Sequence, residues 1–505
     1  MDTLQQLGTG FGIVLTWKNI LFCLLGCVWG TCVGALPGLG PMAGMALLLP
    51  LTYTLDPTAG IIMLAGIFYG AMYGGSTTSI LLRIPGEAAS VVTCIDGYEM
   101  ARRGRAGPAL MIAAVGSFIG GTLSLVGLML FAPPLAKAML TVGPAAECVL
   151  MVLALLAVSV VSSGPPIKTL TMVLAGLAIG TVGLDPMTAW PRFMYGRIEL
   201  SDGISFVALA IGLFGVSEIL FNLEVKVLEK AVAPKLRDLL PRISDLKESA
   251  MPIARGSLIG FVFGLIPGVS HIVSTFVSYA AEKRLSKRPE EFGKGAIAGV
   301  AGPETANNAT TGSSLIPLLV LGIPSIPATA ILLSAMLIHG VQPGPQMLTE
   351  NPNIFWGLIA SMYIGNLILL VLNLPMVGLF VNLLRIPNGY FAPFILVVSM
   401  IGVYSVKSQV FDVWVMLAAG AVGYVLRKFE YDVAPLLLAL VLGDRIEVSF
   451  RRALTISDGD YWTFAQGPAA RVFLATLAIL LALQALAWGF GYRKRFANSA
   501  ANEAT

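Results

Sequence analysis

Long apolar blocks separated by short polar segments dominate the pattern of the chain. Nine of these blocks approach or exceed the length of about 20 residues with which a helix crosses a hydrocarbon core. They cover residues 57–82, 107–132, 143–163, 166–182, 203–222, 354–384, 390–404, 410–426 and 469–491. Three further apolar regions, at 19–53, 256–281 and 295–335, are interrupted by glycine and proline. The pattern predicts an all-α polytopic membrane protein with about 11 to 14 helices.

Composition supports a membrane environment and excludes several kinds of soluble protein. Charged residues make up 12% of the 505 positions, against about 25% in soluble domains. Mean hydropathy is +0.83. The net charge of +4 comes with no basic and aromatic groove, so we expect no nucleic-acid partner. The five cysteines lack CxxC spacing and a clustered histidine, which predicts buried free thiols and no metal beyond a coupling ion.

Three short motifs occur twice along the chain in the same order. GALPGLGP at 34–41 matches GLIPGVSH at 264–271, an offset of 230 residues. Gly-Ser-Thr at 75–77 followed by Ile84-Pro85 matches Gly-Ser-Ser at 312–314 followed by Ile323-Pro324. A weaker Ser-Asp-Gly pair lies at 201–203 and 457–459. We divide the chain into a first half (11–224), a linker (225–241), a second half (242–492) and a polar tail (493–505).

Charge placement indicates that the two halves have opposite orientations. Segment 50–60 has no lysine or arginine, while 83–105 carries four arginines. In the second half the order is reversed, because 282–294 carries five basic residues and 339–353 none. Short basic loops stay in the cytoplasm, so corresponding loops lie on opposite sides and the repeats are inverted. The basic linker also falls on the cytoplasmic side.

The first of two kinds of helix break is the Pro-Gly pair in each half, Pro37-Gly38 and Pro267-Gly268. Arms 255–266 and 269–282 are too short to cross a membrane, which predicts a re-entrant hairpin with its tip near mid-membrane. In the first half the arms are longer, and two full spans are the alternative.

The second kind of break is a polar cluster, at 74–79 in the first half and 307–314 in the second. We expect both runs to unwind a helix, so that hydroxyls, amides and freed N–H groups bind a carboxylate while carbonyls hold sodium. The alternative is that small polar residues only pack helices closely. Candidate substrate-binding residues are Gly38, Gly75, Ser76, Thr77, Thr78, Gly268, Asn308, Thr310, Thr311, Gly312, Ser313 and Ser314. Candidate ion-binding residues are Pro37, Pro267, Asn307 and Glu304.

Charged and titratable residues near these breaks have competing interpretations. Arg83 and Glu87 flank Ile-Pro-Gly, and an interfacial ion pair or a role in holding the fold is preferred over substrate contact. Glu304 is either a cation or proton site or a helix cap. His271 is either a titrating or anion-binding group or a structural imidazole, and His339 is expected at an interface.

At these motifs the sequence resembles the large membrane subunit of the tripartite tricarboxylate transporters, the TctA family. The stretches that carry the resemblance are 34–44, 69–110 and 302–325. The resemblance implies a multi-pass protein of the bacterial inner membrane that takes up a carboxylate such as citrate by symport with sodium, or with protons. It also implies a TctC-like periplasmic solute-binding protein, a small TctB-like membrane subunit with about four helices, and an elevator movement. Membrane lipids and a second copy of the subunit are further expected partners.

Two other function classes compete with this one. A membrane serine hydrolase would use Ser270 or Ser313 with His271 or His339, but the chain has no Gly-x-Ser-x-Gly and no HExxH. An ion channel or scaffold is disfavoured by the paired breaks, which are typical of alternating access. No GxxxxGK[ST] motif supplies ATP binding, so we expect no enzyme activity and no cofactor.

Overall fold

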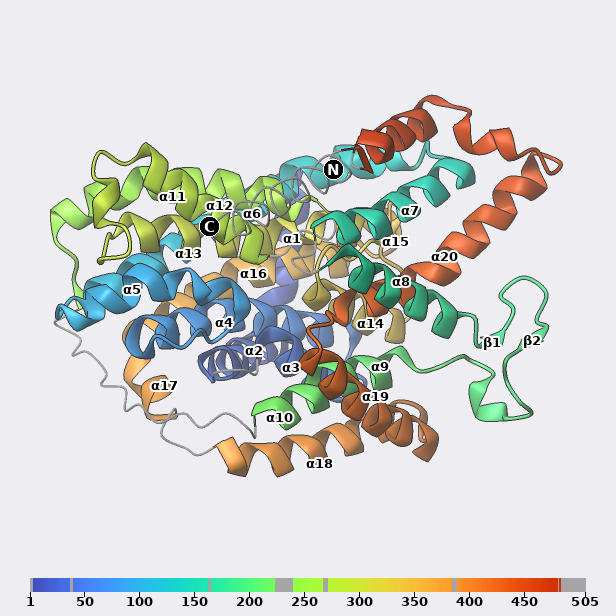
Figure 1. The fold of residues 1–505 in the computed structure, drawn as a ribbon, viewed down its shortest axis with the longest axis horizontal. Coiled ribbons are helices and arrows are strands. Elements are labelled where there is room, and N and C mark those ends of the chain that lie inside the picture. The colour runs from blue at the N-terminus through green and yellow to red at the C-terminus, as the bar shows by residue number, and fades with distance from the viewer. Residues whose placement is uncertain are drawn as a thin grey trace, which may run out of the picture.

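The computed structural model describes residues 3–36, 40–161, 165–222, 239–266, 271–383, 388–479 and 481–482, and it is overwhelmingly helical (Figure 1). The elements up to residue 222 are α1 (Thr3–Val14), α2 (Trp17–Ala35), α3 (Gly40–Thr52), α4 (Pro57–Leu82), η1 (Ala88–Val91), α5 (Thr93–Arg102), α6 (Ala106–Met139), α7 (Pro144–Val161), α8 (Pro166–Gly180), β1 (Gly183–Leu184), β2 (Pro191–Arg192), η2 (Ile198–Leu200), α9 (Phe206–Ala210), the π-helix η3 (Ile211–Val216) and α10 (Ser217–Asn222).

The remaining elements lie after residue 242. They are α11 (Ile243–Gly264), α12 (His271–Leu285), η5 (Pro289–Glu291), α13 (Ala298–Ser313), the π-helix η6 (Pro317–Leu321), α14 (Pro327–Ile338), α15 (Met347–Glu350), α16 (Pro352–Asn373), α17 (Val377–Leu383), α18 (Asn388–Lys407), α19 (Val410–Lys428), α20 (Ala434–Ile456) and η7 (Tyr461–Ala465). A further apolar helix covers Pro468–Ile479. The all-α membrane fold predicted from the apolar blocks is therefore confirmed.

Five of the described helices are long and apolar enough to span a membrane: α2, α4, α6, α16 and α19. The predicted span 354–384 is wrong as one element, because α16 ends at Asn373 and α17 begins at Val377. The apolar pattern also missed α20. The second half of this helix carries several charged residues, which end the apolar run at about residue 443.

Two helix pairs, one in each half, pack with their backbones in direct contact. A Cβ on Gly30 of α2 would overlap the carbonyl of Ile67 in α4, and a Cβ on Gly260 of α11 would overlap the carbonyl of Ala306 in α13. Each contact is flanked by glycines four residues before and after, so rows of glycines line α2 and α11. The glycines are 230 positions apart (260 − 30) and the carbonyls 239 (306 − 67), the spacings of the sequence repeat.

Helices in the later part of each half pack against the other half. A Cβ on Gly176 of α8 would overlap the carbonyl of Leu436 in α20, and a Cβ on Gly212 of η3 would overlap the carbonyl of Met416 in α19. Both contacts are extensive. These contacts join the two halves, which therefore do not form separate units.

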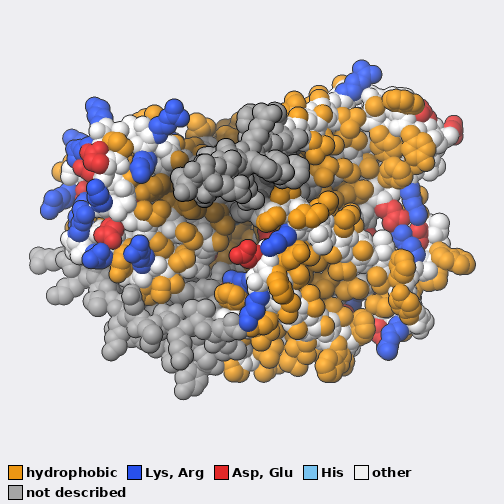
Figure 2. Space-filling view, in the orientation of Figure 1, with side chains coloured by type: hydrophobic (Ala, Val, Ile, Leu, Met, Phe, Trp, Pro, Cys, Tyr) orange, Lys and Arg blue, Asp and Glu red, His pale blue; other side chains and the backbone are white. Residues whose placement is uncertain are grey.

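Charge is distributed unevenly between the two ends of the molecule. Figure 2 shows lysine and arginine side chains gathered at the end where α5 and the ends of α11, α12 and α13 lie. The short antiparallel hairpin of β1 and β2, which pairs Gly183 with Arg192 and Leu184 with Pro191, lies at the opposite end beside α20 (Figure 1). Hydrophobic side chains make up much of the described surface between the two ends, interrupted by a few charged side chains (Figure 2).

The expectation that the polar clusters unwind their helices is wrong. α4 continues through Ser79 to Leu82, and α13 continues through Asn307 to Ser313. Hydroxyl groups in both clusters donate back to carbonyls three or four residues earlier, as Ser79 does to Gly75 and Thr311 to Asn307. These polar side chains are therefore satisfied within the helix, and the helix continues through them. The left-handed breaks come later, at Arg83 (φ 59°) and Gly322 (φ 68°).

The Pro-Gly tips, Pro37-Gly38 and Pro267-Gly268, lie outside the described residues, as does Ser270. The arm before the second tip is longer than the apolar pattern predicts, because α11 begins at Ile243 and has 22 residues. At about 1.5 Å per residue it is about 33 Å long. α12 has 15 residues and is shorter than a membrane core is thick.

Candidate functional site

A buried region rich in polar side chains lies where α13 meets α4, η1 and α5. Its centre is Glu304, whose side chain accepts hydrogen bonds from the Ser76 hydroxyl of α4 (2.5 Å) and from the Thr93 hydroxyl of α5. Glu304 is 1% exposed. It is the seventh residue of α13, so the interpretation as a helix cap is wrong. The helix instead presents this carboxylate to the first half.

A second carboxylate, that of Glu87, enters the same region from the segment between α4 and α5. One oxygen accepts from the Ala89 backbone N–H (2.8 Å), and the other accepts from the Asn307 side-chain amide (3.0 Å). Glu87 is 8% exposed and caps η1. Asn307 lies one turn beyond Glu304 on α13, so the two carboxylates are joined through one face of that helix. We call Glu87, Glu304, Ser76, Thr93 and Asn307 the carboxylate cluster.

No lysine, arginine or histidine forms an ion pair with either carboxylate among the residues that the structure describes. Arg83, expected as a partner of Glu87, is exposed and lies with its guanidinium 5.8 Å from the centre of the Tyr98 ring. The expected ion pair is therefore not formed, whereas the alternative of Glu87 holding the fold agrees with its cap and its bond to Asn307.

Amide oxygens in the same region lack hydrogen-bond donors. The Asn307 side-chain oxygen and the Asn308 side-chain oxygen are buried, and neither has a partner within the described part of the chain. The Asn308 amide N–H donates to the Glu304 carbonyl (3.3 Å). Buried acceptors are usually satisfied, so two free oxygens one residue apart call for a ligand or water.

The other face of α13 is occupied by contacts within the second half. The Thr310 hydroxyl lies within hydrogen-bond distance of the Gly260 carbonyl (3.1 Å) and the Ser274 hydroxyl (2.8 Å). The Ser313 hydroxyl also donates to the Gly260 carbonyl (3.3 Å). Ser314 donates to the Thr311 carbonyl. The structure thus places Thr310 and Ser313 at a helix contact and away from Glu304.

Thr311 and His271 connect α13 to α12. The Nε2 atom of His271 lies 3.1 Å from the Thr311 hydroxyl, which itself donates to the Asn307 carbonyl (2.9 Å). The ring of His271 also packs edge-on against Phe68 of α4. These contacts agree with a structural imidazole.

The remaining candidates of the first half line close helix contacts. A Cβ on Gly75 would meet the Glu87 side chain at 2.8 Å, and Thr78 donates back to the Gly75 carbonyl. Ser76 and Thr77 line a small cavity with Tyr73 and Ser117. In the second half, a Cβ on Gly312 would meet the Tyr69 hydroxyl at 2.7 Å. The structure brings Gly75 and Ser76 to the carboxylate cluster and leaves Gly312 outside it.

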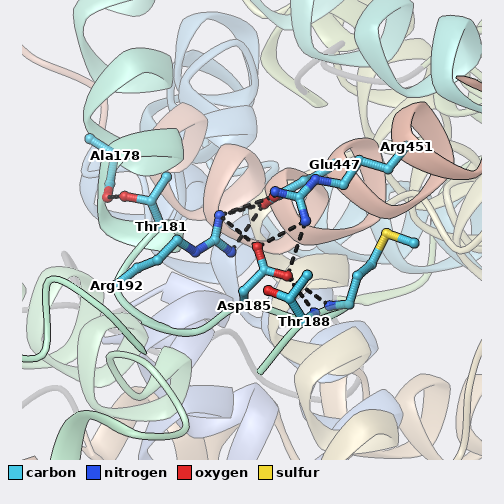
Figure 3. Close-up of polar contacts among 8 residues, drawn as sticks. Ala178, Thr181, Asp185, Thr188, Arg192, Glu447 and Arg451 are labelled. Carbon is cyan, nitrogen blue, oxygen red and sulfur yellow. Dashed lines mark hydrogen bonds and ion pairs between the residues drawn. The ribbon is translucent and has the colours of Figure 1, made fainter. Parts of the chain in front are cut away.

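A contrasting polar site lies at the far end of the molecule (Figure 3). Arg451 of α20 donates to both oxygens of Asp185 (3.0 and 2.8 Å), and Arg192 of β2 donates to both oxygens of Glu447 (3.0 and 3.1 Å). Backbone N–H groups of Thr188 and Met187 also donate to Asp185. Hydrogen bonds from the backbone N–H groups of Thr188 and Met187, together with the bond from the Arg451 guanidinium, hold the pKa of Asp185 well below its usual range. We call these four charged residues the outer network.

The geometry does not support a serine hydrolase. His271 contacts Thr311, and Ser313 donates to the Ala309 carbonyl (2.9 Å). His339 follows α14 and lies within reach of Gly60, and its Nε2 has no partner in the described residues. A nucleophile needs a base within hydrogen-bond reach, and Ser313 has none among the described side chains.

Sequence reasoning did not list Thr93 or Glu87 as site residues. Thr93 begins α5 and follows η1 after one residue. A signal was present for Glu87, since a carboxylate in a mainly apolar Ile-Pro-Gly turn needs a reason to be there. For Thr93 the sequence held no signal, because its role depends on how α5 folds back over α4.

Comparison with known proteins places the chain in one family. The model described as "Tripartite tricarboxylate transporter TctA family" matches residues 20–438. An uncharacterised 52.8 kDa protein of Agrobacterium vitis from the TAR-I ttuC' 3' region is 47% identical over 475 residues, which cover 94% of this chain and 95% of that protein. A second protein of the same species, from the TAR-II ttuC' 3' region, is 47% identical over 226 residues, or 44% of this chain and 93% of that protein. No solved structure matches.

Proposed function

The chain belongs to the tripartite tricarboxylate transporter TctA family, and from this premise we propose that it is the large transmembrane subunit of a secondary transporter for a tricarboxylate or a related carboxylate. Uptake is driven by an ion gradient, sodium in preference to protons. A TctC-like periplasmic binding protein delivers the substrate, and a small TctB-like membrane subunit completes the complex. The expected place is the bacterial inner membrane, with the basic end of the molecule in the cytoplasm.

The observation that carries this proposal is the carboxylate cluster between α4, α5 and α13. Polar and charged side chains inside a membrane protein are costly, and they occur mainly where a solute or ion is handled. Glu304 is bound by hydroxyls from two elements of the first half, so the cluster joins the halves. A site shared by two halves is what alternating access requires, because its shape changes when they move.

The paired glycine contacts support the inverted-repeat part of the proposal. Gly30 against Ile67 and Gly260 against Ala306 are equivalent positions at the offsets of the sequence repeat. The contacts of α20 with α7 and α8, and of the 206–222 segment with α18 and α19, give it further support. In this proposal, an elevator movement carries the glycine-packed pairs and the Pro-Gly tips across the membrane.

The substrate carboxylates bind to hydroxyl and amide donors near the cluster. Ser76 and Thr77 line the small cavity, and Asn308 and Thr311 lie on the side of α13 that faces away from α11. The other candidate substrate-binding residues lie in the same polar clusters or at the Pro-Gly tips of the sequence: Gly38, Gly268, Thr78, Thr310, Gly312, Ser313 and Ser314. Each hydrogen bond to a charged carboxylate contributes about 1.5–3 kcal/mol.

Reconstitution tests the dependence on partners. Uptake of labelled citrate and of a dicarboxylate is measured in vesicles holding this chain alone, with the small membrane subunit, and with both partners. We expect uptake only with both partners. Equal uptake by the chain alone would contradict the proposal, and a transmembrane current without substrate would favour the ion channel.

A further inference from the structure

We propose that the carboxylate cluster is a sodium site in which Glu87 is a ligand equal in importance to Glu304. The proposal rests on the proposed function, since the bound ion is the one that drives uptake. Neither the apolar pattern nor the family match assigns Glu87 to an ion. The argument rests on charge, on the unpartnered amide oxygen of Asn307, and on the number of oxygen atoms in the cluster.

The charges of the cluster are not compensated by protein groups. Glu87 and Glu304 are 8% and 1% exposed, and Glu87 is bonded to Asn307, which lies one helical turn after Glu304 on α13. An isolated buried carboxylate is strongly unfavourable unless a counter-charge or several donors stabilise it. Within the described residues, Glu304 accepts hydrogen bonds only from the hydroxyls of Ser76 and Thr93, and Glu87 accepts from two backbone N–H groups of η1 and from Asn307. A cation is what the pair lacks.

A neighbouring buried carboxylate shows how the fold compensates such a charge when no ion is needed. Asp96 of α5 accepts three backbone N–H bonds, from Gly293, Gly295 and Ala296 at 2.7 to 2.9 Å, and one from the Tyr279 hydroxyl at 2.8 Å. Asp96 is fully buried. Each carboxylate of the cluster has fewer donors than Asp96, and most of these donors are hydroxyls or an amide whose oxygens remain free to bind an ion.

The Asn307 side chain is an independent sign of a ligand. Its residue is 1% exposed, its N–H group is fixed on Glu87, and its oxygen has no donor among the described residues. The amide thus sits in the cluster with a free acceptor. An acceptor that finds no donor is suited to a cation.

The composition of the cluster favours sodium over a proton. A proton needs two oxygens, one to carry it and one to accept it, whereas a hard metal ion uses several. Here the available oxygens are two carboxylates, the Asn307 amide oxygen and the hydroxyls of Ser76 and Thr93. All are hard ligands, and no sulfur or imidazole binds to either carboxylate in the described structure.

The titratable groups around the cluster do not supply the positive charge that the two carboxylates lack. Cys94 of α5 is near Glu304 but is neutral as a thiol, and burial raises its pKa. Arg83 is exposed over Tyr98. His271 of α12 contacts Thr311, and Asp96 faces the 293–296 loop. On each packed element the charged groups have other partners or lie in solvent.

The ligands come from both halves, and this gives the site its coupling role. Ser76 and Thr93 belong to α4 and α5 and Glu87 precedes η1, while Asn307 and Glu304 belong to α13. An ion held by both sets stabilises the arrangement in which the halves meet as they do here. Release of the ion leaves two buried carboxylates in the cluster without a counter-charge, which favours a different arrangement.

Sodium binding by the purified full-length chain tests the site without transport. Binding of ²²Na⁺ and the rise in unfolding temperature with NaCl, against choline chloride at equal ionic strength, are measured for wild type, Glu87→Gln, Glu304→Gln and Asn307→Ala. We expect saturable binding by wild type. Either glutamine variant should raise the sodium concentration for half-saturation about tenfold or more, and Asn307→Ala should raise it by a smaller factor.

The control is Glu147→Gln, which removes one exposed carboxylate from α7 and should leave sodium binding unchanged. Unchanged binding in Glu87→Gln would overturn the role of Glu87. Absence of saturable binding in folded wild type, or equal stabilisation by Mg²⁺, would overturn the sodium site. Carboxylate uptake driven by a proton gradient would still leave the transport function standing, so the two failures are distinguishable.

Discussion

The carboxylate cluster and the outer network each contain two carboxylates, but they treat the charge in opposite ways. In the outer network, Arg451 and Arg192 neutralise Asp185 and Glu447 (Figure 3). In the cluster, Glu304 has only neutral donors. The first arrangement is complete without a ligand and holds β2 against α20. The second is incomplete, which indicates that one site holds the fold and the other handles an ion.

The largest effect is expected when the cluster loses a charge. Glu304→Gln keeps an oxygen that can accept from Ser76 or Thr93, so the protein should stay folded while sodium-driven uptake falls about 100-fold. Uptake in vesicles and the melting temperature of the purified chain are the two measurements. Wild-type uptake from a folded variant would show that the charge of Glu304 serves no transport role.

A smaller difference should separate the two faces of α13. Ser76→Ala removes a donor from the cluster and should lower apparent sodium or substrate affinity about tenfold. Ser313→Ala removes a hydroxyl that bonds within the second half, to Ala309 and Gly260. It should change affinity little, and a matched titration of uptake compares them. A larger effect for Ser313 would reverse this assignment and favour the broader set of substrate-binding residues.

The outer network should respond in stability and leave ion affinity unaltered. Arg451→Met leaves Asp185 without its strongest charged partner, so the unfolding temperature should fall by a few degrees. The half-saturating sodium concentration should stay at the wild-type value. A sodium affinity that changed with intact stability would show that the two regions are coupled.

The smallest effect concerns acid. The pKa of Asp185 is held below its unfolded value, so its contribution to stability is present above the unfolded value of about 4 and is lost as pH falls through the folded value. Between pH 5 and 8 the outer network should therefore contribute equally. Limited proteolysis of the 183–203 segment across this range should give constant rates in wild type, and rates that rise already at pH 6 would contradict the assignment.

The sequence predicted the membrane class, most helices, and the two polar clusters because each depends on local composition. It did not predict which face of α13 carries the candidate site. That depends on tertiary packing, because Glu304 faces α4 and α5 whereas Thr310 faces α11 and α12. It also misjudged the polar runs as breaks, because hydroxyls that bond back to carbonyls leave a helix intact. The glycines at 26, 30 and 34 and at 256, 260 and 264 recur every four residues in the sequence, but this spacing alone does not identify the helix that each row contacts.

The glycine contacts between α2 and α4, and between α11 and α13, have a mechanical consequence. Two helices that touch through a glycine row and carbonyls have no layer of side chains that could change rotamer and let them slide. A shift by one residue would bring the Cβ of Thr31 to the place where Gly30 now meets Ile67. Each pair must therefore turn or translate as one rigid body, and any motion during a transport cycle must be confined to the surfaces where larger side chains separate the helices.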